Sequence, residues 1–186
     1  LCASGLSATI DAARAIQVSD EHLMISGGVE NMTRGPLVMS KASGAYGRDQ
    51  QLFDSSFGWR FINPKMKELF GVDSMGDTAE NVAEKYKISK TDQDKFAFWS
   101  QQKAAKAQSE GRFAKEIASI SIPQKKGDPI QFANDEFIKP KTTLEGLAGL
   151  KPSFKKDGSV TAGNASGLND GAAALLIASE QGIKTK

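Results

Sequence analysis

The single cysteine of this chain, Cys2, stands where a helical pattern begins. A thiol near a helix N-terminus faces unpaired backbone N–H groups and the positive end of the helix dipole, and both favour the thiolate. The small residues Ala3, Ser4 and Gly5 leave room for a substrate carbonyl, and the free N–H groups can hold a developing oxyanion. Cys2 is therefore a candidate nucleophile, although its position alone favours a buried, inert cysteine.

A second candidate is the stretch of residues 160–176, which holds three glycines and five alanines. Glycine lets a backbone approach a ligand closely, and polar residues such as Asn164 and Ser166 lie between the small ones. The stretch continues into an apolar run, residues 172–178, that fits a fully buried strand. This pattern suits an extended ligand lying on the main chain, whereas a tight turn in a packed core is the plainer alternative.

Composition excludes several classes of function. The 24 Lys and Arg residues against 22 Asp and Glu residues give a net charge of +2, which lacks the excess of positive charge typical of nucleic-acid-binding proteins. One cysteine excludes an internal disulfide and a multi-cysteine metal site, and a single histidine leaves little for a histidine cluster. No run approaches the roughly 20 apolar residues of a membrane span, and no signal peptide is present. We therefore expect a cytoplasmic protein without a membrane or nucleic-acid partner.

Both ends of the chain look cut, so we expect an internal piece of a longer protein.

Helix-and-strand patterns at the two ends of the chain must position these residues. Residues 3–17 predict an amphipathic helix, and residues 22–27 predict a buried strand that Gly27 and Gly28 end. His22 begins this strand beside two acidic residues, which indicates a surface residue rather than a base. Two core strands do not form a stable sheet by themselves, so we expect further chain or a partner to complete it.

The middle of the chain predicts an insertion of mixed helices and loops into this α/β layer. Residues 30–72 are irregular and rich in aromatic residues, and loops of that length are usually functional. Asp77 with Glu80 resembles a capping box, and Ser89 with Asp92 predicts the start of a second helix. The remaining expected elements are an end of that helix near 109–111, a half-buried strand at 118–122, a turn at 125–128, a strand at 130–132 and a short helix near 143–150.

Four blocks, in this order and at this approximate spacing, resemble the thiolases. They are residues 2–5, 27–32, 75–81 and 163–173, and the last block is highly specific. Within that family, residues 57–64 followed by 70–75 are similar to the β-ketoadipyl-CoA thiolases of bacterial aromatic-acid degradation. The resemblance covers the whole chain.

The resemblance implies an α/β fold with the layered α-β-α-β-α architecture of thiolases. This chain would hold only part of the N-terminal half and the loop domain. Residues 1–37 would belong to the N-terminal core, residues 38–158 to the loop domain, and residues 159–186 to the return into the core. The family usually forms dimers or tetramers, so we expect a homo-oligomer.

The resemblance also implies an activity, the cleavage of a 3-oxoacyl-CoA by CoA. The substrate would be 3-oxoadipyl-CoA, and Cys2 would carry the acyl group as a thioester. CoA and its thioesters would be substrates, and no covalently bound cofactor or metal is implied. The residues that match positions near CoA are Ala162, Ser166, Gly167, Met75 and Lys139.

Two departures and one specificity hypothesis accompany this resemblance. The activating histidine and the second cysteine of the family do not occur here, so we expect the fragment alone to turn over nothing detectable. Arg60, between Trp59 and Phe61, can pair with the distal carboxylate of 3-oxoadipyl-CoA, although a surface or interface salt bridge is its more ordinary role. Three alternatives stay open: an acetoacetyl-CoA thiolase, a non-catalytic CoA-binding or oligomerisation module, and a ketosynthase-type relative.

Overall fold

A computed structural model describes residues 2–184 as two units. The first unit consists of Leu1–Pro64 and Leu168–Lys186, and the second consists of Lys65–Gly167. In the sequence, the second unit therefore separates two pieces of the first. The loop-domain limits expected at residues 38 and 158 remain a prediction.

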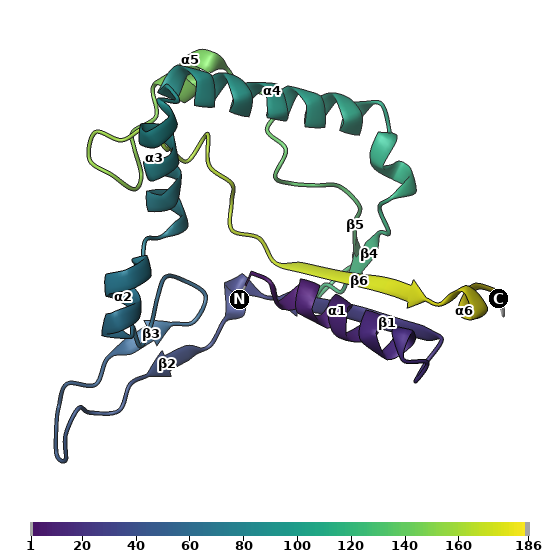
Figure 1. Ribbon diagram of the computed structural model, residues 1–186. Helices are drawn as coiled ribbons and strands as arrows, with labels where there is room; N and C mark the ends of the chain where they lie inside the picture. Colours follow the sequence, from purple (N-terminus) through teal and green to yellow (C-terminus); the bar gives the residue numbers. More distant parts are fainter. Residues whose placement is uncertain (1, 185–186) are drawn as a thin grey trace. The chain divides into compact units, whose positions relative to one another are not determined.

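The centre of the first unit is a pair of long antiparallel strands with one helix beside it (Figure 1). Strand β1 (Leu23–Glu30) pairs with β6 (Gly171–Ala178), from Leu23 opposite Ala178 to Glu30 opposite Gly171. Helix α1 (Ser4–Gln17) confirms the predicted helix and packs against both strands. Thr9 Oγ1 lies 3.2 Å from Ser26 Oγ and joins α1 to β1.

Strand β1 continues through Gly27 and Gly28 to Glu30, so the predicted strand end at the two glycines is wrong. Every residue of β1 has a partner in β6. A Cβ atom at Gly27 would lie 2.5 Å from the carbonyl oxygen of Ala173, so glycine permits the close approach of the two strands. Pairing with a strand distant in sequence thus overrides the low strand propensity of glycine.

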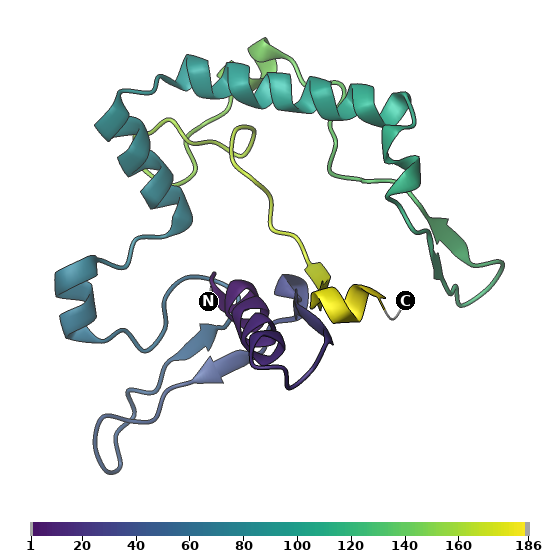
Figure 2. The same ribbon diagram turned by 45° about the vertical axis from the view of Figure 1, so that its right-hand side comes forward.

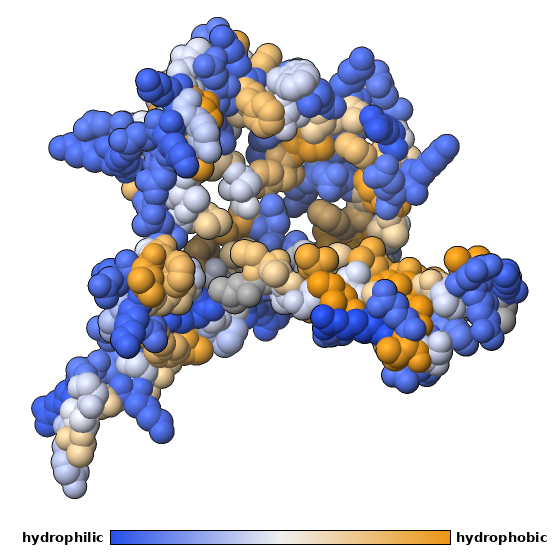
Figure 3. All heavy atoms as spheres, viewed as in Figure 1, coloured by the Kyte–Doolittle hydropathy of each residue, from blue (hydrophilic) through white to orange (hydrophobic). Residues whose placement is uncertain are grey.

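Strand β6 is exposed within the described residues, contrary to the expected burial. Leu175 and Leu176 expose 54% and 68% of their surface. In the described part of the chain the sheet has only two strands, so apolar side chains away from α1 face outward. Figure 3 shows hydrophobic residues gathered over α1 and β6, and exposed Leu6, Val18 and Ile25 belong to the same unit.

Short elements occupy the region that the sequence pattern left irregular. They are the 3-10 helix η1 (Met32–Arg34), the antiparallel strands β2 (Leu37–Met39) and β3 (Leu52–Asp54), and helix α2 (Pro64–Phe70). Pro64 begins α2, because proline at the first helical position has no N–H group to lose. Asp170 accepts hydrogen bonds from Thr33 N at 3.0 Å and Thr33 Oγ1 at 2.8 Å, which ties η1 to the residue before β6.

Helix α3 (Met75–Tyr86) lies in the second unit, and its cap differs from the prediction. The capping box is formed by Ser74 and Asp77, because Ser74 Oγ accepts from Asp77 N and the Asp77 carboxylate accepts from Ser74 N at 3.2 Å each. Glu80 is therefore not the acid of the box. Its side chain points into the unit, where it binds a distant segment.

Helix α4 (Lys90–Ser109) and the elements after it largely confirm the predicted boundaries. Ser89 caps α4 by accepting from Asp92 N at 3.1 Å, and Gly111 follows the helix with φ of 70°. After η2 (Arg112–Lys115), strands β4 (Ile120–Ile122) and β5 (Ile130–Phe132) form the predicted hairpin, but all three residues of β4 are exposed, whereas a half-buried strand was expected.

A short helix, α5 (Leu144–Ala148), lies against α4 in both views (Figures 1 and 2). Thr143 caps it by accepting from Gly146 N at 3.0 Å, which confirms the helix predicted near residue 143. The first unit closes with α6 (Glu180–Lys184). Among the described residues, the helices are all too short or too polar to cross a bilayer.

Candidate functional site

The segment of residues 158–167 lies on a buried carboxylate that sequence reasoning did not identify. Glu80, on α3, is 4% exposed. Its oxygens accept from Ser159 N at 2.9 and 3.0 Å, from Val160 N at 2.7 Å and from Ser159 Oγ at 3.1 Å. Desolvation raises the pKa of the Glu80 carboxyl. The hydrogen bonds from Ser159 and Val160, together with the attraction of the Lys155 ammonium, outweigh this effect, so the pKa of Glu80 is lowered overall. Glu80 is thereby held as a carboxylate beneath the 158–167 segment.

Asn164 joins the same segment to α4. Its Oδ1 accepts from Thr161 N at 2.7 Å, while its Nδ2 donates to Asp94 Oδ1 at 3.0 Å and to Ser159 O at 3.1 Å. Thr161 is fully buried and Asp94 is 4% exposed. The Lys90 ammonium donates to Asp94 Oδ2 at 2.6 Å, so the buried aspartate is paired with a cation on its own helix.

Two glycines bring the 158–167 segment against apolar side chains. A Cβ atom at Gly163 would lie 2.5 Å from both Leu147 Cδ2 and Leu150 Cδ1. A Cβ atom at Gly167 would overlap the ring of Phe137. Glycine is therefore required at both positions for the backbone to lie as close to its neighbours as it does.

Lys139 and Gly167, both predicted to lie near CoA, contact the same aromatic ring. Lys139 Nζ lies 6.0 Å from the ring centroid of Phe137, on which Gly167 packs. The main chain of Lys139 is fixed by a 2.7 Å hydrogen bond from its N–H group to Gln101 Oε1, and its ammonium donates to Glu136 O at 3.3 Å. The structure thus brings these two predicted residues together through Phe137.

The other three predicted CoA residues of the second unit are exposed. Ala162 and Ser166 lie in the 158–167 segment, on either side of the buried contacts of Gly163 and Asn164. Met75, the first residue of α3, exposes 75% of its surface. All three side chains are accessible to a ligand.

Cys2 lies in the first unit, two residues before α1, and its thiol is exposed. An exposed thiol differs from the buried, inert cysteine that position alone favoured. Ala3, at the N-cap position, provides no side-chain hydrogen bond to the start of the helix. Cys2 is thus accessible beside the start of α1.

Arg60 is half-buried among aromatic residues of the first unit. Its Nη1 donates to Gly58 O at 3.0 Å. The neighbouring Phe61 packs edge-to-face on Phe53, with 5.3 Å between the ring centroids. One guanidinium nitrogen thus binds the local main chain, and a guanidinium group has five N–H donors in all.

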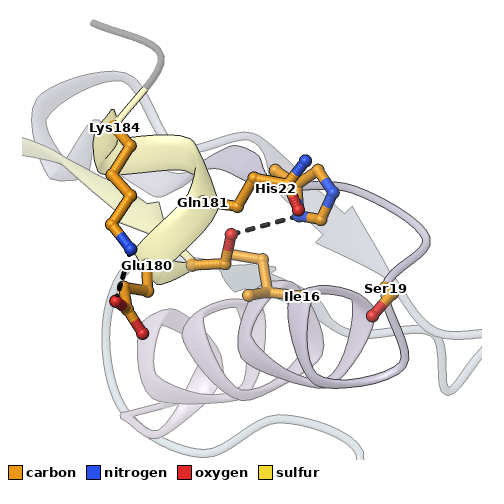
Figure 4. Close-up of a pocket in the computed structure, with 7 residues that line it drawn as sticks. Ile16, Ser19, His22, Glu180, Gln181 and Lys184 are labelled. Carbon is orange, nitrogen blue, oxygen red and sulfur yellow. Dashed lines mark hydrogen bonds and ion pairs between the residues drawn. The ribbon is translucent and has the colours of Figure 1, made fainter.

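His22 lines a shallow hollow at the other end of α1 (Figure 4). Its Nδ1 lies 3.1 Å from Ser179 Oγ, and Lys184 Nζ beside it pairs with Glu180 at 2.6 Å. Cys2 precedes the 14-residue helix α1 and His22 follows it, so about 20 Å separates them. His22 is therefore out of reach of the thiol.

Comparison with known protein families identifies the family of this chain. The family described as "Thiolase, N-terminal domain" matches residues 1–181. The chain belongs to the thiolase family. This confirms the family that the four sequence blocks indicated.

Individual thiolases are similar over nearly the whole chain. The "Beta-ketoadipyl-CoA thiolase" of Acinetobacter baylyi is 58% identical over 183 residues, which are 98% of this chain and 46% of the relative. Human mitochondrial 3-ketoacyl-CoA thiolase is 39% identical with a TM-score of 0.82, over 100% of this chain and 46% of that one. The same human enzyme in complex with CoA gives a TM-score of 0.78 at 39% identity, over 100% of this chain and 44% of that one.

These similarities confirm the α/β fold class and show which part of the thiolase fold the chain contains. The described residues form the N-terminal part of the thiolase fold. The chain spans about half the length of the curated relatives it matches. The roles predicted for Cys2, for Arg60 and for the residues near CoA remain predictions.

The residues that sequence reasoning missed are the three that hold the 158–167 segment of this thiolase chain in place. Lys90 and Asp94 stand four residues apart on one helix, which is a signal for an ion pair but not for burial. Glu80 stood in a pattern that a capping box also explains. Its bond to Val160 spans 80 residues, and no local pattern predicts such a contact.

Proposed function

We propose that this chain supplies the nucleophile and part of the CoA site of a thiolase that cleaves 3-oxoadipyl-CoA with CoA. The observation that carries the proposal is the 58% identity, over 98% of the chain, to a relative named "Beta-ketoadipyl-CoA thiolase". The exposed thiol of Cys2 next to the start of α1 supports it chemically.

In the first step, the Cys2 thiolate attacks the C3 carbonyl of the 3-oxoacyl chain. The C2–C3 bond breaks, its electron pair leaves with the C2 fragment, and protonation of that fragment gives acetyl-CoA. The shortened acyl group stays on Cys2 as a thioester. In this proposal, main-chain N–H groups near the start of α1 would stabilise the oxyanion that precedes bond cleavage.

In the second step, the thiolate of CoA attacks the thioester carbonyl. The Cys2–acyl bond breaks, the thiolate returns, and a shortened acyl-CoA leaves. Both steps need a group that moves a proton, and His22 is out of reach of Cys2. We therefore assign these proton transfers to residues outside the described part of the chain.

The CoA moiety would lie on the exposed side of the 158–167 segment. Ala162, Ser166 and Gly167 offer small side chains and accessible main chain there, and Lys139 adds a cation next to Phe137. Met75 is exposed at the start of α3 and can contact the pantetheine arm. The proposal includes a homo-oligomer, a dimer or a tetramer, because thiolases usually form one.

Trapping the acyl-enzyme tests the proposal. The intact protein, mixed with 3-oxoadipyl-CoA in the absence of free CoA, should release acetyl-CoA and carry a succinyl group on Cys2, because the second step then lacks its nucleophile. Peptide mass spectrometry locates the group, and added CoA should remove it. CoA binding without acylation of Cys2 would contradict the proposal and would indicate a non-catalytic CoA-binding module.

Arg60 would select the dicarboxylate substrate through a bidentate pair with its distal carboxylate. We expect Arg60→Ala to lower kcat/KM for 3-oxoadipyl-CoA by about 10-fold more than kcat/KM for acetoacetyl-CoA, which has no such carboxylate. Arg48→Ala, which removes an exposed arginine of the same unit, is the matched control and should leave both values unchanged. An equal loss on the two substrates after Arg60→Ala would remove the hypothesis.

A further inference from the structure

The proposed reaction does not use Glu80, although this carboxylate is among the most buried charges of the described chain. Carboxylates are almost never buried unless they are paired. The partners of Glu80 are N–H groups of Ser159 and Val160 together with the Ser159 hydroxyl. The Glu80 carboxylate therefore fixes the main chain at the start of the 158–167 segment, before Ser166.

Asn164 provides a second attachment five residues after Ser159. Its amide oxygen fixes the Thr161 N–H group, and its amide nitrogen reaches both Asp94 and the Ser159 carbonyl. All three hydrogen bonds are 2.7 to 3.1 Å long. Asn164 therefore closes a turn of the segment and attaches that turn to α4.

Lys90 connects the attachment point on α4 to helix α5. Besides Asp94, its ammonium donates to Leu147 O at 2.9 Å and Ala148 O at 3.4 Å, which are carbonyls at the end of α5. Helices α4 and α5 are thus held together at the point where Asn164 binds. Cations near a helix C-terminus also stabilise its unpaired carbonyl groups.

Close packing leaves the segment little room to shift. A Cβ atom at Gly158 would overlap the Glu80 carboxylate, and one at Gly163 would meet Leu147 and Leu150. The main chain is therefore fixed on both sides of Ala162, and Ser166 and Gly167 follow directly from it.

We infer that Glu80 and Asn164 are positioning residues for CoA. They fix the backbone that carries Ala162, Ser166 and Gly167, so that this surface is formed before CoA binds and less ordering is needed on binding. The inference rests on the proposed function, because it takes those three residues as the CoA contacts. Neither Glu80 nor Asn164 needs to touch the ligand.

The test compares two variants of the intact protein with a matched control. Asn164→Ala removes three side-chain hydrogen bonds from the turn and should raise the Kd for CoA about 10-fold. Glu80→Gln keeps an oxygen for the two N–H groups and should stay within about 3-fold. Glu84→Ala, one turn further along α3 at an exposed position, should bind CoA as the unmodified protein does. Calorimetric titration with CoA measures all three.

A second readout separates positioning from general damage. Iodoacetamide has no CoA arm, so the rate of Cys2 labelling should be the same in Asn164→Ala and in the unmodified protein. If labelling and CoA binding change together, or if Asn164→Ala binds CoA unchanged, the inference is wrong. Should Asn164→Ala not fold, Ser159→Ala replaces it in the test. This variant keeps both main-chain donors to Glu80 and should raise the Kd about 3-fold. An unchanged Kd would overturn the inference. If the unmodified protein does not bind CoA, that result contradicts the proposed function itself and not only the positioning role of Glu80 and Asn164.

Discussion

Cys2→Ala is expected to lower kcat/KM for cleavage of 3-oxoadipyl-CoA by at least about 10³-fold in the intact protein. The proposed mechanism passes through a thioester on this sulfur, and Cys2 is the single cysteine of the chain. The residues proposed to contact CoA offer no replacement for the nucleophile. Steady-state rates of acetyl-CoA formation measure the loss.

Cys2→Ser distinguishes chemistry from packing in this experiment. Serine fills nearly the same space as cysteine, but its hydroxyl is a weak nucleophile unless a base activates it. If Cys2 is the nucleophile, both variants should be almost inactive while their Kd for CoA and their thermal unfolding remain unchanged. A serine variant with most of the original activity would show that the sulfur has only a structural role.

Glu80→Ala is expected to lower the free energy of unfolding by about 3 kcal/mol. The substitution leaves the N–H groups of Ser159 and Val160 without their acceptor, and Val160 is only 5% exposed. Each unsatisfied buried donor costs about 1 to 3 kcal/mol. Denaturant unfolding of the intact protein measures the change.

Glu84→Ala is the control for this loss, because Glu84 lies on the same helix and pairs with Lys155 at the exposed surface. Exposed ion pairs contribute little, so its unfolding curve should match that of the unmodified protein. An equal effect of the two substitutions would contradict the role assigned to Glu80.

The stabilisation by Glu80 should also depend on pH. The folded-state pKa of Glu80 is lowered, so its contribution is present above the unfolded value of about 4.3 and is lost as pH falls through the folded pKa. Glu80→Gln does not titrate at this position. The difference in unfolding free energy between the unmodified protein and Glu80→Gln should therefore shrink below about pH 4.

The local elements of the chain could be predicted because the interactions that define them lie within a few residues. Ser89 accepts from the N–H group of Asp92, and Thr143 caps α5 in the same way. The order of the four motif blocks was likewise enough to indicate the family.

The sequence pattern could not resolve competing local explanations. Asp77 can serve as a cap residue or as the acid of a capping box, and the presence of Ser74 decided for the second. Pro64 begins α2, whereas proline inside a helix would interrupt it. In both cases the residue type permits two structures, and only the neighbouring backbone selects one.

The sequence by itself determined the α/β class, the family, the candidate nucleophile Cys2 and the segment that carries Ser166. The tertiary structure alone decided that β1 runs through Gly27 and that β6 is exposed in the described residues. It also decided that the buried carboxylate of Glu80 holds Val160 in place, 80 residues away. The physical reason is that burial and hydrogen bonding depend on which distant segments meet, whereas helix caps and turns depend on neighbours along the chain.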